Sequence, residues 1–360
     1  MMERRAVVVT GVGVVNAAIV GASPALGAWL AAPRPAARVT AHGRPAVRLP
    51  EGTLAGLIDP GEARRLSRVC QLTIAAARLA TVESGLDPAR GLGLVVGSEL
   101  GDFTSTIAFA DGYLARGAAG LSALLFPNTV MNTMAATTAI AVAARELALT
   151  LNVPTVAGEL AIARGVAAVA SGRVDAVLAG GVDEVDPLVE EMLGTLGDRD
   201  VRGEGAAFLV LEAESVARAR GATTLGRLAG AAWRALPARP WGVGRRSGSR
   251  AIEEALAGAA LGPPGFVYCS ASGDAERDSW EARVLAAALG DATPPAVSLA
   301  PLLGQHAGLG ALRVAAALWT ARAGVLPDDA GGPARRVAGP GLVHGLARGG
   351  AHVAVISSAA

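Results

Sequence analysis

The sequence predicts a layered α/β fold made of two similar halves, and three observations support this prediction. Short valine-rich runs alternate with alanine-rich stretches, a pattern typical of buried strands joined by helices. The chain of 360 residues is 52% hydrophobic, which is enough for a large core, and its 47 glycines suit close backbone packing. The predicted strands form two series of equal size. We therefore expect a duplicated fold, with an N-terminal half at 1–222 and a C-terminal half at 223–360.

The predicted strands are short apolar runs bounded by glycine, proline or charged residues. In the first half they are residues 6–15, 91–96, 153–157, 175–180 and 206–211. In the second half they are residues 224–229, 265–270, 296–299, 341–346 and 352–356. Alanine-rich helices are expected at 64–79, 134–148, 161–170, 280–288 and 309–323, and the proline-containing segment 236–249 is expected to be a loop.

Charge and cysteine usage exclude several classes of function. The 32 basic and 31 acidic residues leave a formal charge of +1 without a block of one sign, so neither nucleic acid nor a membrane surface is expected as a partner. Glycines 11 and 13 interrupt the apolar N-terminal run, which favours a strand over a signal peptide. Cys70 and Cys269 are far apart and lack metal-ligand spacing. We expect a cytoplasmic protein without a metal or cofactor.

Nine motifs follow one another along almost the whole chain. They are VVVTGVGVV at 7–15, RRLSRVCQL at 64–72, GLVVGSE at 93–99, FPNTVMN at 126–132, SGRVDAVLAGGVDEV at 171–185, GEGAAFLVLE at 203–212, DSWEARVLAAAL at 278–289, SLAPLLGQHAGLGALRVAAAL at 298–318 and ARGGAHVAVI at 347–356. In this order and spacing the sequence resembles the β-ketoacyl synthase family. The resemblance implies the thiolase fold, an αβαβα sandwich of two related halves.

The resemblance also implies a set of condensing residues that this chain lacks. Family members use a cysteine at a helix N-terminus, two histidines, a lysine and a glycine-rich turn that helps to form an oxyanion hole. Counting forward from Asn152 places Glu159 at the cysteine position, whereas counting back from Gly181 places Thr155 there. The remaining positions are Ser272 for the first histidine, Ala300 for the lysine, Gln305 or His306 for the second histidine, and Arg348 for a phenylalanine in the turn.

Loss of the nucleophile with the scaffold retained resembles the chain-length factors of aryl polyene and type II polyketide systems. The resemblance implies a heterodimer with a catalytic ketosynthase subunit, contact with acyl carrier protein through that complex, and a part in shaping the acyl tunnel. We expect 153–157, as an edge strand, and 126–134 at the subunit contact. The candidate tunnel residues are Met131, Thr133 and Met134.

Two other functions are compatible with the sequence. One is an enzyme that uses the same pocket for cyclisation, dehydration or acyl transfer through Glu159, His306 or Ser272. The other is a homodimeric acyl-binding scaffold. Each candidate also has a purely structural interpretation: Glu159 as a carboxylate just before a helix, and His306 as a helix-start residue. The same applies to His42, His344 and His352 as scattered structural histidines, to Asp183 and Glu184 as loop or contact residues, and to the charged cluster at 198–204 as local exposed ion pairs.

Overall fold

The structure is a computed structural model that describes residues 4–41, 43–87, 91–290, 293–330 and 332–360. Within these residues one mixed sheet runs through the whole molecule, in the order β12-β11-β15-β16-β10-β1-β9-β7-β5-β6. The strands of the first half are β1 (Val7–Asn16), β5 (Leu92–Ser98), β6 (Ala148–Asn152), β7 (Ala176–Asp183) and β9 (Gly205–Ala213). Those of the second half are β10 (Gly226–Ala235), β11 (Phe266–Cys269), β12 (Ala296–Ser298), β15 (Gly341–Leu346) and β16 (Ala351–Ser358).

The two halves of this sheet have the same strand order, which confirms the duplicated fold. Outward from the centre, the order is β1-β9-β7-β5-β6 in the first half and β10-β16-β15-β11-β12 in the second. When the five strands of each half are numbered along the chain, both orders are first, fifth, fourth, second and third. The halves join where β1 pairs antiparallel with β10, over Val7–Val9 and Gly226–Leu228 only. This junction is short because the two antiparallel strands overlap only through their first three residues. The division of the chain after residue 222 stays a prediction.

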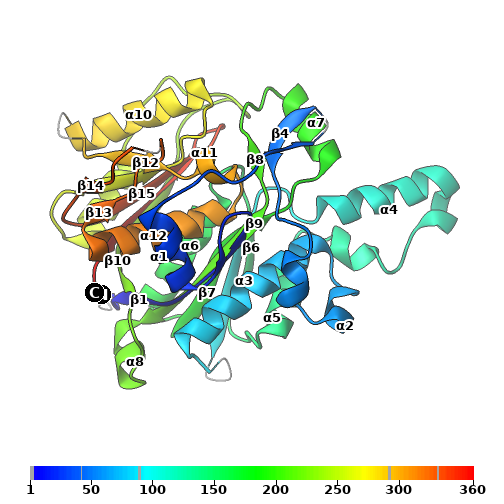
Figure 1. Cartoon of the computed structure of the whole chain (residues 1–360), viewed down its shortest axis with the longest axis horizontal. Helices are drawn as coiled ribbons and strands as arrows, with labels where there is room; N and C mark the ends of the chain where they lie inside the picture. Colours follow the sequence, from blue (N-terminus) through cyan, green and yellow to red (C-terminus); the bar gives the residue numbers. More distant parts are fainter. Residues whose placement is uncertain (1–3, 42, 88–90, 291–292, 331) are drawn as a thin grey trace.

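Helices form three further layers around the two half-sheets (Figure 1). Helices α6 (Ala157–Ala170) and α12 (Gly308–Ala323) lie between the half-sheets and pack on strands of both. Helix α3 (Arg68–Ser84) covers the outer face of the first half, and α9 (Arg250–Ala259) covers that of the second. The other helices are α1 (Ser23–Ala31), α2 (Pro60–Ala63), α4 (Phe103–Arg116), α5 (Thr133–Ala141), α7 (Pro187–Thr195), α8 (Glu214–Ala219), α10 (Ala275–Leu289) and α11 (Ala300–Leu303). The resulting five layers are the αβαβα sandwich that the sequence predicted.

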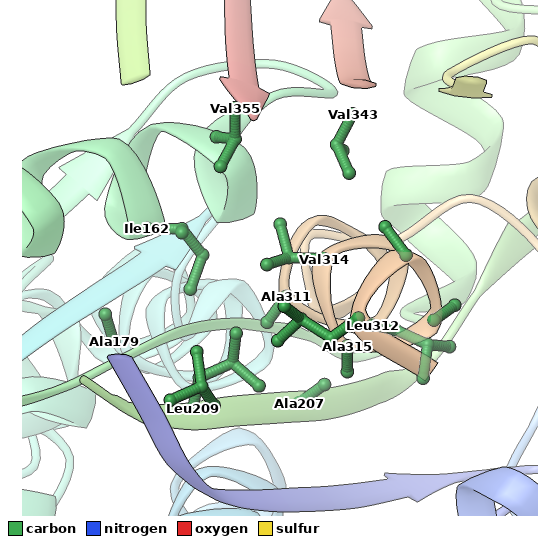
Figure 2. Close-up of a cluster of buried hydrophobic side chains, with 14 of the residues drawn as sticks. Ile162, Ala179, Ala207, Leu209, Ala311, Leu312, Val314, Ala315, Val343 and Val355 are labelled. Carbon is green, nitrogen blue, oxygen red and sulfur yellow. The ribbon is translucent and has the colours of Figure 1, made fainter. Parts of the chain in front are cut away.

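Small side chains allow the middle layer to lie close to both half-sheets. Figure 2 shows α12 between β9 and the ends of β15 and β16, with Leu312 and Val314 among the drawn side chains. Ala207 and Leu209 of β9 belong to the same buried cluster, as does Val343 of β15. Burial of such a cluster stabilises the fold by about 25 cal/mol for each Å² of apolar surface removed from water.

Short elements complete the structure at its periphery. They are the strands β2 (Val20–Gly21), β3 (Val39–Ala41), β4 (Arg44–Val47), β8 (Arg202–Gly203), β13 (Val325–Leu326) and β14 (Arg335–Arg336), and the 3-10 helices η1 (Thr53–Gly56), η3 (Gly117–Gly120) and η4 (Phe126–Thr129). No helix among the described residues is long and apolar enough to cross a membrane.

Two of the predicted elements are wrong. Residues 153–157 are not a strand, because the edge strand is β6 and the chain turns at Pro154 before α6 begins at Ala157. A proline cannot donate the hydrogen bond that a strand interior requires. The helix predicted at 134–148 stops at Ala141, and Ala143 adopts a positive φ of 54°. The other predicted strands and helices are present with boundaries that differ by a few residues.

Candidate functional site

The turn between β6 and α6 has a strained backbone centred on Thr155. Its φ is 62°, a left-handed value that a β-branched residue rarely adopts. The N–H of Val156 donates to the carbonyl of Pro154 at 2.6 Å, so the three residues form a γ-turn with positive φ. Such strain persists only where the surrounding structure enforces it, and it is concentrated at functional sites. The geometry therefore marks this strand-to-helix turn as the candidate site.

Thr155 and Glu159 occupy different places at this turn. Thr155 is at the turn itself, 8% exposed, which is the position found by counting back from Gly181. Glu159 lies in the first turn of α6, not before the helix as the sequence suggested, because α6 begins at Ala157. Neither residue carries a thiol, so the start of α6 offers no cysteine nucleophile.

Glu159 forms a buried ion pair with Arg313 of α12. The guanidinium of Arg313 donates to Oε1 of Glu159, and both side chains have no exposed surface. The two helices cross here at Gly158 and Gly310, where a Cβ atom on Gly158 would lie 1.9 Å from the carbonyl oxygen of Ala307. Two glycines at the crossing thus bring the carboxylate and the guanidinium together. Arg313 was not identified from the sequence, although a lone charge on an otherwise apolar helix was a usable signal.

Gln305 connects this ion pair to the turn. Its Nε2 donates to the carbonyl of Thr155 at 3.3 Å, and its Oε1 accepts from Arg313 at 3.5 Å. Thr155, Glu159, Gln305 and Arg313 therefore form one buried polar group beneath the turn. Of the two candidates for the second histidine position, Gln305 is the one that contacts the turn.

His306 lies beside this group, but its ring turns toward the start of β9. Its Nδ1 and Cε1 lie within 3 Å of the place a Cβ atom on Gly308 would occupy, and its Cε1 lies 3.1 Å from that of Gly205. By hydrogen-bond geometry neither ring nitrogen has a partner among the described residues, although the Gly205 backbone lies close enough to offset part of the fall in pKa. Burial, together with the positive charges of Arg313 and Arg202, lowers the pKa of His306 to about 3. The ring is therefore neutral at physiological pH and is not a general acid there.

A buried aspartate holds the loop that carries Gln305 and His306. Asp183 accepts hydrogen bonds from the Ser98 hydroxyl and the Glu99 N–H at 2.8 Å each, and from the Ala307 N–H at 2.7 Å. Asp183 is 3% exposed, so its expected role as a loop or contact residue is wrong. It links the ends of β5 and β7 to the loop before α12.

The other positions assigned from the resemblance lie in separate contacts. Ser272 bonds to Asp200 and accepts from Arg277, and Arg348 pairs with Asp274 at 2.6 and 2.7 Å. Ala300 is buried at the start of α11, which is also away from the turn. None of these three bonds to Thr155 or Glu159 within the described part of the chain.

The charged cluster at 198–204 is buried except for Arg199, which corrects the expectation of local exposed ion pairs. Arg202 is 4% exposed and pairs with Glu99, and Glu204 is fully buried and pairs with Arg68. These partners are more than 100 residues away in the sequence. The cluster joins the end of β5, α3 and the segment before β9, and among the ion pairs of the described residues in it only the 3.6 Å contact between Arg202 and Asp198 is local.

The histidines near the C-terminus belong to a second buried network. His344 Nδ1 lies 2.8 Å from Glu281, and His344 Nε2 lies 3.4 Å from His352 Nδ1. Burial alone would raise the pKa of Glu281, but the hydrogen bond with His344 holds that pKa below its usual range. The structural role predicted for His344 and His352 fits these contacts. The third histidine of that prediction, His42, lies outside the described residues. No group of three or more metal-ligating residues occurs in the described chain.

The candidate tunnel residues differ in their exposure. Met134 has no exposed surface and belongs to the core under α3, and Thr133 is 5% exposed at the start of α5. Met131 is 45% exposed and its sulfur lies 3.2 Å from where a Cβ atom on Gly101 would be. Of the three, only Met131 has substantial surface available to a ligand or partner.

Apolar side chains are exposed on one arm of the molecule. Helix α4 projects from the body (Figure 1), and the chain returns through η3 and η4 to α5. Of the fourteen large hydrophobic residues exposed in the described chain, eight lie between residues 113 and 140. We call them the arm surface: Tyr113, Leu114, Leu121, Leu124, Phe126, Val130, Met131 and Ile140. Exposed apolar side chains concentrated in one segment make this arm a candidate interaction surface.

The open edge of the sheet belongs to the same half of the molecule as the arm surface. Strand β6 is the last strand of the sheet and, among described residues, pairs only with β5. An unpaired strand edge offers N–H and C=O groups to another chain. The sequence predicted this edge strand five residues too late, at 153–157 instead of 148–152.

We expect the purified chain to form no acyl-enzyme. The turn has no thiol, and burial raises the pKa of Cys269 to about 12, so its thiolate is about 1,000-fold scarcer than for an ordinary cysteine. Intact-mass measurement after incubation with acylated carrier protein should show no adduct, whereas iodoacetamide in urea should label both cysteines. A stoichiometric acyl adduct on Thr155, Glu159 or Cys269 would contradict this expectation.

His306 should make stability depend on pH. Its pKa in the folded chain is about 3, against an ordinary value of 6.5, so below pH 6.5 the unfolded chain binds a proton that the folded chain does not. The stability advantage of wild type over His306→Phe should shrink by about 2 kcal/mol between pH 6.5 and 5. Urea unfolding of both proteins at the two pH values measures this change. Parallel pH profiles would contradict it.

The fold and the strained turn define a thiolase-like protein whose site lacks a thiol. Residues 53–197 match the family described as β-ketoacyl synthase, N-terminal domain. The chain is 29% identical over 314 residues to the putative polyketide β-ketoacyl synthase 1 of Streptomyces virginiae, a match covering 76% of this chain and 73% of the relative.

Solved structures of ketosynthases share the whole fold. The ishigamide ketosynthase/chain length factor superposes with a TM-score of 0.88 at 24% identity, over 99% of this chain and 100% of the other. A type II polyketide synthase acyl carrier protein in complex with its ketosynthase gives a TM-score of 0.85 at 19% identity, over 99% and 100%. The chain is thus similar to polyketide β-ketoacyl synthases, its residues 53–197 match the β-ketoacyl synthase N-terminal domain, and its fold is thiolase-like.

Proposed function

We propose that this chain is a non-condensing, chain-length-factor-type subunit that pairs with an active ketosynthase in polyketide or aryl-polyene-type chain elongation. The observation that carries the proposal is the combination of a strained turn without a thiol and an arm surface in the same half of the molecule as an open sheet edge. The first feature leaves the condensation to another subunit, and the second provides a surface to bind it.

Several features support a heterodimer over an enzyme that acts alone. Glu159 is neutralised by Arg313 and has no exposed surface, so it is poorly placed to act as a base on a substrate. The ishigamide structure is described as a ketosynthase/chain length factor, and the second one as a carrier protein in complex with its ketosynthase. By analogy, the acyl carrier protein would meet this chain through the complex, with Met131 at the subunit contact beside the acyl tunnel. Two free cysteines suit a cytoplasmic location.

Substitution in the arm surface should break the proposed complex. Leu124 is 89% exposed, and burying such a side chain in an interface is worth about 1.5–3 kcal/mol, so Leu124→Asp should weaken association about tenfold or more. Val82 on α3 is 80% exposed outside the arm, so Val82→Asp is the matched control and should leave association unchanged.

The measurement is size-exclusion chromatography with light scattering, using the chain co-expressed with a ketosynthase that retains its cysteine. A 1:1 complex that Leu124→Asp dissociates and Val82→Asp preserves would support the proposal. A chain that forms only a homodimer beside that ketosynthase would favour the acyl-binding scaffold instead, and a monomer would refute any subunit role.

A further inference from the structure

A large groove lies where the two half-sheets join, away from the arm surface and the strained turn. Its volume is about 920 Å³. Its floor is β10, one wall is the end of α6, and the other is the end of α9. It lies where β10 continues past the start of β1, in the middle of the sheet order, so a subunit bound at β6 would leave it accessible.

The floor of the groove includes a strand edge that has no partner among the described residues. Strand β10 pairs with β16 along Arg227–Ala235, but with β1 only along Gly226–Leu228. Among described residues, 229–235 therefore have a strand neighbour on one side only. At about 3.3 Å per residue these seven positions span about 23 Å, the length of a short extended peptide.

The side chains around this edge are basic and apolar. Arg4 and Arg227 line the groove, are exposed, and form no ion pair with the described residues. Arg164 lies over the ring of Trp233, which also lines the groove, at 5.3 Å from its centroid. Glu254 in the wall does not neutralise the positive charge of these three arginines, because it is already paired with Arg234.

We propose that this groove binds an extended acidic peptide segment by strand addition to the free edge of β10. The peptide backbone would pair with 229–235, alternate acidic side chains would meet Arg4, Arg164 and Arg227, and apolar ones would pack on Val166 of α6. Charge complementarity selects an acidic partner, and the unpaired edge selects an extended one. This function is independent of the proposed ketosynthase pairing.

The test uses the full chain and a fluorescein-labelled heptapeptide of alternating glutamate and valine, with binding followed by fluorescence anisotropy. Arg227→Glu should weaken binding about tenfold, and raising the salt concentration should weaken it further. Arg283 on α10 is exposed and outside the groove, so Arg283→Glu is the matched control and should leave the affinity within about twofold.

Backbone pairing is tested with two N-methylated forms of the same peptide. Only alternate residues of an added strand direct their N–H groups at β10, so methylation of one alternating set should weaken binding at least about tenfold while the other set binds as before. Equal binding by both forms would show that the groove attracts anions without strand addition. Absence of binding, or equal loss with Arg283→Glu, would also overturn the proposal.

Discussion

Arg313→Met should destabilise the chain by about 3–5 kcal/mol, because it leaves the carboxylate of Glu159 buried without its counter-charge. Glu159→Leu should cost a similar amount by isolating the guanidinium. The double variant, Glu159→Leu with Arg313→Met, should recover most of the loss, since two apolar side chains of similar volume often replace a buried ion pair without penalty. Urea unfolding with an unchanged m-value is the measurement.

An exposed ion pair on α8 provides the control for this cycle. Arg218 and Glu214 lie 3.2 Å apart, with 78% and 36% of their side chains exposed. Arg218→Met should therefore change the free energy of unfolding by about 1 kcal/mol or less. If the double variant is no more stable to unfolding than the less stable single variant, Glu159 and Arg313 are not coupled. Other contacts would then stabilise the structure beneath the turn.

The edge strand shows how a local pattern misled the prediction. Residues 153–157 contain two valines, which predict a strand, but Pro154 has no N–H to donate. The real strand, Ala148–Asn152, alternates apolar and polar residues, as expected for a strand at the border of a sheet. The proline was the better signal, because it reports backbone chemistry and not only hydrophobicity.

Helix α4 shows a different kind of failure. Its ends carry recognisable signals, since the side chain of Asp102 accepts from the N–H of Ser105 and Gly117 follows the last residue. Its apolar residues, however, do not face this chain's core, and Leu114 is 80% exposed. No helix was predicted here, although the apolar residues of α4 recur at a helical period at least as regularly as those of α3.

The site itself was predictable in its residues but not in its geometry. The sequence left Thr155 and Glu159 as alternatives because two reference points gave different counts, and only the positive φ of Thr155 separates their positions. The partner of Glu159 is 154 residues away on another helix, and no local pattern connects them. The buried aspartate Asp183 was misjudged for the same reason, since its three hydrogen-bond donors come from β5 and the loop before α12.

Gly158→Ala should prevent stable folding or reduce stability by about 3 kcal/mol or more. A Cβ atom there would lie 1.9 Å from the carbonyl oxygen of Ala307 and 3.1 Å from Cα of Gly310, so the backbone of α12 would have to move. Overpacking in a well-filled core costs about 1–3 kcal/mol even where side chains can yield, and here the obstruction is main chain.

The matched control is Gly258→Ala in α9, where a Cβ atom would meet nothing within 4 Å. Alanine is the better helix former at both positions by about 0.5–1 kcal/mol, so Gly258→Ala should be neutral or stabilising while Gly158→Ala fails. Soluble yield and the urea midpoint compare the two. Equal midpoints would mean that α12 can shift away from α6 at little cost, and the crossing would then not be what holds Arg313 against Glu159 beneath the strained turn.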